Sequence, residues 1–599
     1  MKIKDIYIKN FRSLKEETIV FPESGILALV GANNAGKSNI LKAINNILGD
    51  TWFGKDKAEV NDYYNRDCNN NIYIKITFDD NREIELDFLN GGKWAEYKDG
   101  SGKKLNEWNH NLNLYNSTGN AKEDFPCTFL PAERSLEKNL QFRSYELMGK
   151  IAKSFNEKAK SKKMVIEAKF GEVMELLNEV EGFVDFKNDF VNYFNAMQAD
   201  TPYKLKVDFK AFSPLNYFKT INILANDSSI NSEYDIDIDE LGEGNKSLLL
   251  FALLRSYAKN FKQDATGILA VEEPEIYLHP QARRHLFELL FEIVKDSNIQ
   301  IIYTTHSPDF LATEKFDSIG LVSKDPNNGT LVKILSKVDL VKFSKLTGVP
   351  ADKTTTSNIS EFYSTTSNFR LNEGFFAKKL FLVEGETEEL CFPILFKHFG
   401  INTDSSGISF VAVNGKNQIP KYWRLFNSFG IQTEIVIDND DDVTGNKRSS
   451  NNNIASCFNT SVDEILNIED NKSLKVLQCN KEGVFNQNIF ILKTDFETAF
   501  QKDLEKYCEE NHIDNKYQNI LDEAIDIIKP VKKSQKGQVA RFIINRIFNK
   551  YPNFKPSFVK SILDNIDLRL GGQSSQVSSE DKPNVDGLPY NEHNIGDPQ

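Results

Sequence analysis

The sequence feature that constrains this chain most is the octapeptide 31–38, which reads Gly-Ala-Asn-Asn-Ala-Gly-Lys-Ser. It fits the pattern G-x-x-x-x-G-K-[ST] at every fixed position. The apolar run 25–30 before it predicts a buried strand. Apolar residues recur at helical spacing after it, at Ile40, Leu41, Ile44 and Ile47. A strand, a glycine-bearing loop and a helix in this order direct backbone N–H groups and a helix N-terminus toward a phosphate group.

The motif also assigns roles to the side chains of this phosphate loop. We expect Lys37 to neutralise the β and γ phosphates of ATP, and Ser38 to ligate the accompanying Mg²⁺ ion. The other loop residues expected to bind the nucleotide are Gly31, Asn33, Asn34 and Gly36. The alternative is a glycine-rich turn without a ligand, and the strand before and the helix after the loop argue against it.

Length and charge limit the architecture. A chain of 599 residues exceeds what one hydrophobic core supports, so we expect two to four domains. The formal net charge of −13 excludes a protein coated for nonspecific binding of nucleic acid, so any DNA contact needs a local basic patch. The six cysteines form no C-x-x-C pair and indicate neither a zinc site nor a disulfide framework. No apolar run reaches about 18 residues, so we expect a cytoplasmic protein without a membrane partner.

Three more motifs follow the phosphate loop. Residues 242–246 read Gly-Glu-Gly-Asn-Lys ahead of a leucine-rich helical pattern, which suits phosphate at a helix start with Ser247 as a cap. A buried-type strand then ends in Glu272 and Glu273, and a second one is followed directly by His306. Polar side chains at the ends of such strands are candidates for a site, although a solvated strand end is the alternative for the paired glutamates.

These motifs, in this order, resemble the ABC-type ATPase heads of recombination and repair proteins of the RecF and SMC kind. The resemblance covers about residues 1–345. It implies that Glu272 helps to hold Mg²⁺, that Glu273 orients the attacking water, and that His306 senses the γ phosphate.

The resemblance also gives residues 242–247 the role of the signature loop. In such heads this loop closes over ATP bound by another subunit, which would place Gly244 and Lys246 on the nucleotide of a homodimer or a higher homo-oligomer. Two features depart from the pattern of many relatives. Glu272 stands in place of Asp, and the loop reads Gly-Glu-Gly-Asn-Lys instead of Ser-Gly-Gly-Gln. We therefore expect slow hydrolysis, with ATP acting mainly to hold a dimer together.

Three segments lie outside these motifs. Residues of about 135–200 are highly charged with a helical pattern, which predicts an insertion that packs on a partner subunit or, alternatively, a solvated helical hairpin. Residues 346–375 contain Thr/Ser runs and are interpreted as a linker with short helices. Residues 571–599 are poor in apolar side chains, and we expect a disordered tail there.

Carboxylates follow two strand-like runs in the second half of the chain. One apolar run ends at Glu384, and another ends in the acidic sequence 438–442. Open α/β sheets place their sites at the carboxyl ends of strands, and period two puts Asp438 and Asp440 on one side. Concentrated like charges need a divalent cation, and oxygen ligands select Mg²⁺ or Mn²⁺. An acidic surface turn is the alternative.

Glu-Gly at one strand end and Asp-x-Asp at a later one resemble the TOPRIM domain of topoisomerases, primases and related nucleases. An ABC-type head ahead of a TOPRIM domain resembles the OLD family of nucleases, which includes Gabija-type and retron-associated anti-phage nucleases. The likeness extends to about residue 570. We therefore expect an α/β chain with an ABC-type P-loop ATPase domain at 1–345, a helical insertion for dimerisation, and a TOPRIM domain with a basic helical region at 376–570.

The OLD resemblance completes the candidate cleavage site. The metal ligands that it implies or allows are Glu384, Glu388, Asp438, Asp440, Asp442, Asp495 and Glu497. It also implies that Lys536 contacts the scissile phosphate, with Lys532 and Lys533 as alternatives. Lys416 is a weaker candidate for the same contact.

A basic block supplies the DNA-binding patch that the acidic chain needs. Residues 529–560 hold nine Lys or Arg and no Asp or Glu, which predicts a surface for the DNA backbone or, alternatively, an amphipathic helix with a solvated basic face. We expect an ATP-regulated, divalent-metal-dependent DNA endonuclease in anti-phage defence, with a helicase or retron component encoded nearby as a candidate partner. The alternative is an ATP-driven DNA clamp or sensor with an inert TOPRIM domain. For a topoisomerase or primase, no region remains to build the additional domains.

Overall fold

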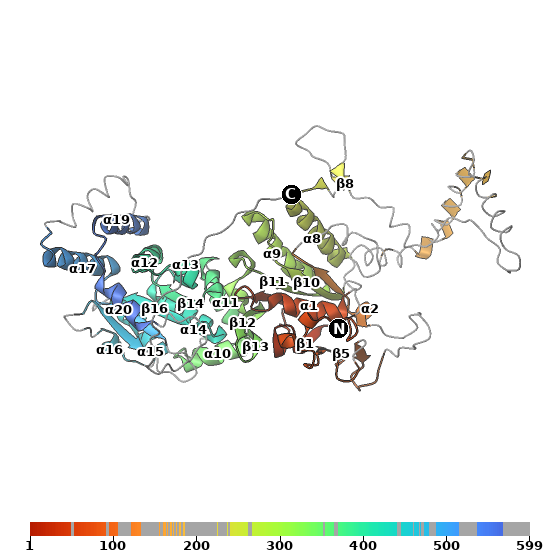
Figure 1. Ribbon diagram of the computed structural model, residues 1–599, viewed down its shortest axis with the longest axis horizontal. Coiled ribbons are helices and arrows are strands. Elements are labelled where there is room, and N and C mark those ends of the chain that lie inside the picture. Colours follow the sequence, from red (N-terminus) through yellow and green to blue (C-terminus); the bar gives the residue numbers. More distant parts are fainter. Residues whose placement is uncertain are drawn as a thin grey trace, which may run out of the picture. The chain divides into compact units, whose positions relative to one another are not determined.

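The structure is a computed structural model (Figure 1) and is described over two domains within residues 1–566. The described residues are 1–49, 53–91, 95–105, 121–132, 240–260, 266–350, 354–364, 369–439, 445–458, 460–466, 468, 472–478, 487–513 and 536–566, with 224–225, 236–237 and scattered positions between 155 and 188. Most of the predicted insertion and the whole predicted tail lie outside them. The same holds for Asp440, Asp442, Lys532 and Lys533. The domain boundaries stay predictions.

A mixed sheet of eleven strands, counted over the described residues, forms the first domain. In spatial order its strands are β6 (Glu96–Lys98), β5 (Glu83–Asp87), β4 (Tyr73–Phe78), β1 (Ile3–Phe11), β2 (Leu14–Val20), β13 (Gly329–Ile334), β12 (Ile319–Asp325), β3 (Ile26–Val30), β11 (Asn298–Thr304), β10 (Thr266–Glu272) and β7 (Cys127–Leu130). The neighbours from β12 to β7 pair in parallel, and β4 and β5 form an antiparallel hairpin. Strand β3 is buried throughout, whereas β4 and β5 alternate as strands with one solvated face do.

Helices cover both faces of the parallel strands, as Figure 1 shows. They are α1 (Lys37–Leu48), α8 (Glu243–Asn260) and α9 (Pro280–Asp296). Successive residues of β3 point to opposite faces, so Leu27 and Leu29 pack with α1 while Ala28 and Val30 pack with α8 and α9. The phosphate loop therefore connects a central strand to a helix of the same three-layered core. The packing of β3 and α1 fixes the two ends of the loop.

Short helical elements connect the two sheets. They are α10 (Lys337–Leu346), α11 (Ile359–Ser364) and the 3₁₀ helix η8 (Phe369–Phe376). In η8 the buried side chain of Asn372 donates hydrogen bonds to the carbonyl oxygens of Pro308 (3.0 Å) and Leu311 (2.8 Å). Pro308 and Leu311 belong to the segment after β11, just beyond His306 and Ser307 in the sequence.

A five-stranded sheet forms the second domain. In spatial order its strands are β15 (Ile408–Ala412), β14 (Lys379–Val383), β16 (Thr433–Asp438), β18 (Asn488–Leu492) and β17 (Leu474–Gln478). All neighbours are parallel except β17, which runs antiparallel to β18. The α/β class predicted from the sequence is confirmed, and the carboxyl ends of β14, β16 and β18 lie at one edge.

Helices also cover both faces of this second sheet. One face carries α12 (Glu386–His398), α17 (Phe496–Glu510), α19 (Lys536–Lys550) and α20 (Ser557–Asn565), and the other carries α14 (Ile419–Phe429) and α15 (Gly445–Phe458). Phenylalanine dominates the first face. The Phe381 ring stacks on Phe410 with centroids 4.6 Å apart and also contacts Phe396 and Phe490. Among the described residues, no helix combines the length and apolar character that crossing a membrane requires.

Phe381→Ala should remove the centre of this aromatic face. Because Phe381 is fully buried, we expect a loss of about 3–5 kcal/mol in the free energy of unfolding. Urea unfolding followed by fluorescence measures it. Leu346→Ala, at a side chain that is 66% exposed, is the control and should change the same quantity by about 0.5 kcal/mol or less. Equal effects of the two substitutions would contradict this packing.

Candidate functional site

The phosphate loop joins β3 to α1 in a conformation that requires its glycines. Gly31 and Gly36 have φ angles of 143° and 111°, in the region that side chains disfavour. A Cβ on Gly31 would collide with the carbonyl oxygen of Val322, and one on Gly36 would collide with the Thr330 hydroxyl. Asn34 adopts the left-handed conformation, with φ 61°. The fixed glycines of the motif are therefore steric requirements of the loop.

Lys37 lies buried in the centre of this loop. Its Nζ donates hydrogen bonds to the carbonyl oxygens of Gly31 (2.8 Å) and Ala32 (2.9 Å). Burial lowers the pKa of Lys37 to about 8, and the negative charges of Glu273 and Glu275 act in the opposite direction. Ser38 follows, half-buried, in the first turn of α1, while Asn33 and Asn34 are exposed on the loop. The Lys37 ammonium group is thus held by carbonyl oxygens of its own loop.

The ends of β10 and β11 bring the next predicted residues toward Lys37. Glu272 and Thr304 are paired at the last positions of the two parallel strands. Glu273 follows in a left-handed conformation, with φ 44°, and its N–H donates to the Thr304 carbonyl oxygen (3.0 Å). Partial burial and the charge of Lys37 lower the pKa of His306, while Glu273 raises it. Lys37, Glu273 and His306 are therefore close enough to interact electrostatically.

The signature loop lies at the start of α8. The helix begins at Glu243, so the prediction that Ser247 caps it is wrong, and Ser247 is buried inside the helix. Lys246 pairs with Glu243 at 3.0 Å, and a Cβ on Gly244 would lie 2.6 Å from the Tyr277 carbonyl oxygen. Gly244 thus lies in the first turn of α8, where N–H groups are available to an anion, whereas the Lys246 N–H already donates to the Gly242 carbonyl oxygen (3.1 Å).

Glu275 lies beside the predicted ATP-binding residues but was not itself predicted from the sequence. It is 6% exposed, and its Oε1 accepts hydrogen bonds from the His306 N–H (2.8 Å) and the Thr305 hydroxyl (2.7 Å). Its Oε2 has no hydrogen-bond partner in the described part of the chain, and burial raises the pKa of this carboxyl. The available signal was a third acid, two residues beyond Glu273. Glu275 positions the loop that carries His306.

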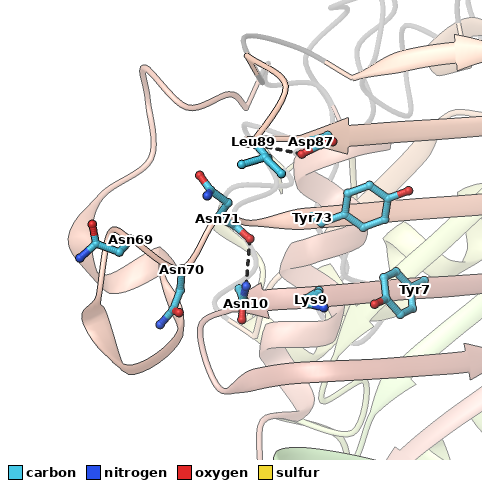
Figure 2. Close-up of a pocket in the computed structure, with 9 residues that line it drawn as sticks. All are labelled: Tyr7, Lys9, Asn10, Asn69, Asn70, Asn71, Tyr73, Asp87 and Leu89. Atoms are coloured by element: carbon cyan, nitrogen blue, oxygen red, sulfur yellow. Dashed lines mark hydrogen bonds between the residues drawn. The ribbon is translucent and has the colours of Figure 1, made fainter.

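A separate hollow of about 460 Å³ lies on the outer face of the antiparallel strands β1, β4 and β5 (Figure 2). It is lined by Tyr7, Lys9, Asn10, Asn69, Asn70, Asn71, Tyr73, Asp87 and Leu89. Polar groups of its lining already have partners: the Asn10 amide donates to the Asn71 carbonyl oxygen (3.1 Å), Asp87 accepts the Leu89 N–H (2.8 Å), and the Tyr7 hydroxyl donates to Glu16 (2.6 Å). Because these groups are already satisfied, this hollow receives no functional assignment.

A second candidate site forms at the carboxyl edge of the five-stranded sheet. Glu384 directly follows β14, and Asp438 is the last residue of β16. The Asp438 N–H donates to Glu384 Oε1 (3.0 Å), which joins the two strand ends. Asp495 follows β18 and caps α17, accepting hydrogen bonds from the Thr498 N–H (2.8 Å) and hydroxyl (3.0 Å). The structure therefore brings carboxylates of three parallel strands to one edge.

The carboxylates at this edge repel one another. Glu388, 8% exposed in the first turn of α12, accepts the Gly385 N–H (3.1 Å). Burial raises the pKa of Glu388 to about 7, with further increases from Glu384 and Glu497. Burial also raises the pKa of Asp438 to about 9, again helped by the neighbouring carboxylates. These shifts are what crowded carboxyl groups show without a cation among them.

This donor set fits a hard divalent cation, which prefers carboxylate oxygens. Asp438 Oδ1 is buried and has no hydrogen-bond partner within the described ranges, so it offers a lone pair to a cation. Among the described residues no group of three potential ligands is already assembled. The two further predicted ligands Asp440 and Asp442 lie outside those residues.

Two lysines predicted to contact phosphate differ in their positions. Lys416 is 6% exposed, and its Nζ donates to the Asp438 carbonyl oxygen (2.5 Å), so it faces the carboxylates and not a solvent channel. Lys536 is the first residue of α19. The next residue, Gly537, is buried against the first turn of α12, where a Cβ would lie 3.2 Å from the Glu386 carbonyl carbon. The start of α19 therefore adjoins the carboxyl edge.

The basic block continues along α19 as an amphipathic helix. Its buried residues include Ile543, Ile544, Ile547 and Phe548. Its exposed cations are Arg541, Arg546 and Lys550. The same exposed charges suit both a DNA-binding surface and a solvated helix face.

Glu275→Leu should disturb the His306 loop, because the His306 N–H and the buried Thr305 hydroxyl would lose the acceptor that Glu275 provides. We expect the kcat of ATP hydrolysis to fall by about 10-fold, since an unsatisfied buried donor costs about 1–3 kcal/mol. Glu275→Gln keeps an acceptor oxygen and should retain most activity. Steady-state phosphate release measures both variants. A leucine variant as active as the glutamine variant would remove Glu275 from the site.

Affinity for Mn²⁺ should rise with pH. Because the pKa values of Glu388 and Asp438 are raised in the metal-free fold, these carboxyl groups keep protons at pH values where the unfolded chain has already released them. The stability of the metal-free protein therefore falls as pH rises from about 4 through about 9, and Mn²⁺ must displace protons that remain. Calorimetry in buffers of different ionisation enthalpy measures the release. Asp438→Asn should remove most of it, and affinity that is constant with pH would contradict the crowding described.

Comparison with known proteins agrees with this two-site architecture. The family described as AAA ATPase domain matches residues 1–125 and 93–311, and the TOPRIM domain of the family described as overcoming lysogenization defect protein-like matches residues 375–440. Domains of these two kinds bind ATP and divalent metal in general. The first of these matches contains the phosphate loop, and the second contains Glu384 and Asp438.

Three curated relatives align with most of the chain. The OLD nuclease of Thermus scotoductus is 25% identical over 73% of this chain and 82% of its own length. The Old nuclease of Escherichia phage P2 is 24% identical over 88% and 92%, respectively. The endonuclease GajA of Bacillus cereus strain VD045 is 23% identical over 74% and 75%. Since the ATPase matches together span residues 1–311, more than half of the chain, this protein belongs to the AAA ATPase domain family and joins that domain to an OLD-like TOPRIM domain.

Proposed function

We propose that this chain is an ATP-regulated, divalent-metal-dependent DNA endonuclease of the OLD type that acts in anti-phage defence. The observation that carries the proposal is the close approach of the Glu384, Glu388 and Asp438 carboxylates at the edge of the second sheet, inside the TOPRIM match. The names of the relatives, OLD nuclease and endonuclease GajA, support the same reaction. DNA is accordingly the proposed substrate.

The carboxylates are proposed to hold Mg²⁺ or Mn²⁺. Glu384, Glu388 and Asp438 form the centre of the set, and the other proposed ligands are Asp440, Asp442, Asp495 and Glu497. Bound divalent ions in such sites polarise the phosphate, activate water and stabilise the leaving oxygen. The chain itself fixes the carboxylates through the Asp438–Glu384 and Gly385–Glu388 hydrogen bonds.

Residues of α19 are proposed to hold the DNA. Lys536, at its N-terminus beside α12, is the candidate for neutralising the scissile phosphate. The exposed cations farther along the helix, Arg541 and Arg546, would contact the backbone on either side. These contacts are independent of base sequence, because phosphates carry no sequence information.

The first domain is proposed to regulate cleavage through ATP. Lys37 and Ser38 would bind the phosphates and their Mg²⁺, and Glu273 and His306 would act on the γ phosphate. Gly244 of a partner head would complete the site in a homodimer or a higher homo-oligomer. A helicase or retron component encoded nearby remains a candidate partner, which the neighbouring genes would reveal.

A DNA clamp or sensor with an inert TOPRIM domain is the alternative. The two functions differ in whether neutralising a central carboxylate changes cleavage.

Glu384→Gln and Asp438→Asn should each lower cleavage by about 100-fold or more, because each removes a charged oxygen ligand of the metal. Nicking of supercoiled plasmid with Mg²⁺ or Mn²⁺ measures the rate. Asp404→Asn, the same kind of change at an exposed residue of α13 (Thr403–Ser406) before β15, is the control and should leave the rate unchanged. Purified Asp438→Asn protein that cuts at the original rate would favour the clamp.

Lys37→Ala should abolish ATP binding and leave metal binding in the second domain intact. The reason is that Lys37 contacts its own loop, whereas the carboxylates belong to a separate sheet. Fluorescent-nucleotide titration measures ATP binding, and the Mn²⁺-induced shift in Tm measures metal binding. Loss of both responses in a folded variant would contradict two independent sites.

A further inference from the structure

Lys416 is held inside the carboxyl edge by the loop between β15 and α14. Asn414 and Gly415 adopt positive φ angles, 58° and 123°, which turn the chain back across the end of β14. The Gly415 N–H then donates to the Glu384 carbonyl oxygen (2.9 Å). This turn carries the Lys416 side chain past β14 to β16, where Nζ contacts the Asp438 carbonyl oxygen (2.5 Å).

The charge of Lys416 faces the carboxylates directly. Its Nζ lies 3.9 Å from Glu384 Oε1, the same oxygen that accepts the Asp438 N–H. The lysine side chain is 6% exposed, and that of Glu384 is 20% exposed. A buried ammonium is costly unless opposite charge and hydrogen-bond acceptors surround it. Lys416 has both, and it could not reach a DNA phosphate without losing them.

We propose that Lys416 is an internal counter-cation of the cleavage site and a positioning residue for Glu384. In the metal-free protein its charge offsets part of the repulsion among Glu384, Glu388 and Asp438. The hydrogen bond from Lys416 Nζ to the Asp438 carbonyl oxygen also joins the end of β16 to the loop that contains Lys416. This inference rests on the proposed metal-dependent cleavage, because it concerns the same carboxylates.

A buried lysine at the opposite edge of the same sheet supplies a matched control. Lys379, the first residue of β14, lies 3.6 Å from Glu434, and their side chains are 6% and 1% exposed. Both Lys379 and Lys416 pair with a carboxylate, but only Lys416 faces the proposed metal ligands. Removing the charge of Lys379 should therefore destabilise the domain to the same extent with and without a metal ion.

The test compares the Tm of wild type, Lys416→Met and Lys379→Met in EDTA and in saturating Mn²⁺. In EDTA both variants should lose about 5–10 °C relative to wild type, as expected for breaking a buried ion pair. In Mn²⁺ the loss in Lys416→Met should shrink to about half or less, because the metal supplies the missing positive charge. The loss in Lys379→Met should stay unchanged. Lys416→Gln, which keeps a hydrogen-bond donor without the charge, should behave as Lys416→Met does.

Each remaining outcome decides one of the two proposals. A wild-type protein whose Tm does not respond to Mn²⁺ would contradict the metal site of the proposed function. A responding wild type with equal losses in both conditions for Lys416→Met would make Lys416 a structural residue and overturn the counter-cation. Failure of both Lys416 variants to fold even in Mn²⁺ would overturn it as well.

Cleavage kinetics separate this role from contact with DNA. Lys416→Met should lower kcat by about 10-fold through misplacement of Glu384, with the KM for plasmid DNA unchanged. A higher KM with an unchanged Mn²⁺ response would instead show that Lys416 binds the phosphate backbone.

Discussion

Repulsion among carboxylates at one sheet edge is the constraint on which the second domain depends. Parallel strands end side by side, so acids placed at the ends of β14 and β16 are forced together by the hydrogen bonds of the sheet itself. The aromatic face around Phe381 holds those strands rigidly, so the acids cannot relieve the repulsion by moving apart. The packing of the core thus offsets the unfavourable electrostatic repulsion at this edge, as is common at binding sites.

In both domains, parallel strands end side by side and bring charged residues together, but the two sites differ in their balance of positive and negative charge. In the first, Lys37 brings a positive charge into a site whose strand ends carry Glu273 and Glu275, so the site contains both signs. In the second, the described carboxylates Glu384, Glu388 and Asp438 outnumber the buried lysine that lies beside them, Lys416. A balanced site suits an anion that arrives with its own Mg²⁺, whereas an acidic edge demands external cations before an anionic DNA strand can approach.

Features within a short stretch of sequence were predictable, and features between distant residues were not. The phosphate loop, the strands that deliver Glu273 and Asp438, and helix α1 follow from local pattern. Glu275 meets His306 across 31 residues, and Lys416 meets Asp438 across 22, so no spacing rule reveals either contact. The incorrect cap at Ser247 has a related cause. The leucine-rich run that follows Ser247 predicted that the helix starts there, whereas α8 already begins at Glu243.

The missing side chain of Gly537 has a consequence for how the second domain tolerates change. Helices α12 and α19 come close at this residue, where a Cβ would lie 3.2 Å from the Glu386 carbonyl group, so any side chain at position 537 would press the two helices apart. The glycine thereby sets a fixed offset between the carboxylates beside α12 and the cations Arg541 and Arg546 on α19. With a rise of about 1.5 Å per residue, inserting or deleting even one residue before Arg541 would shift every later cation relative to that edge and rotate it out of line.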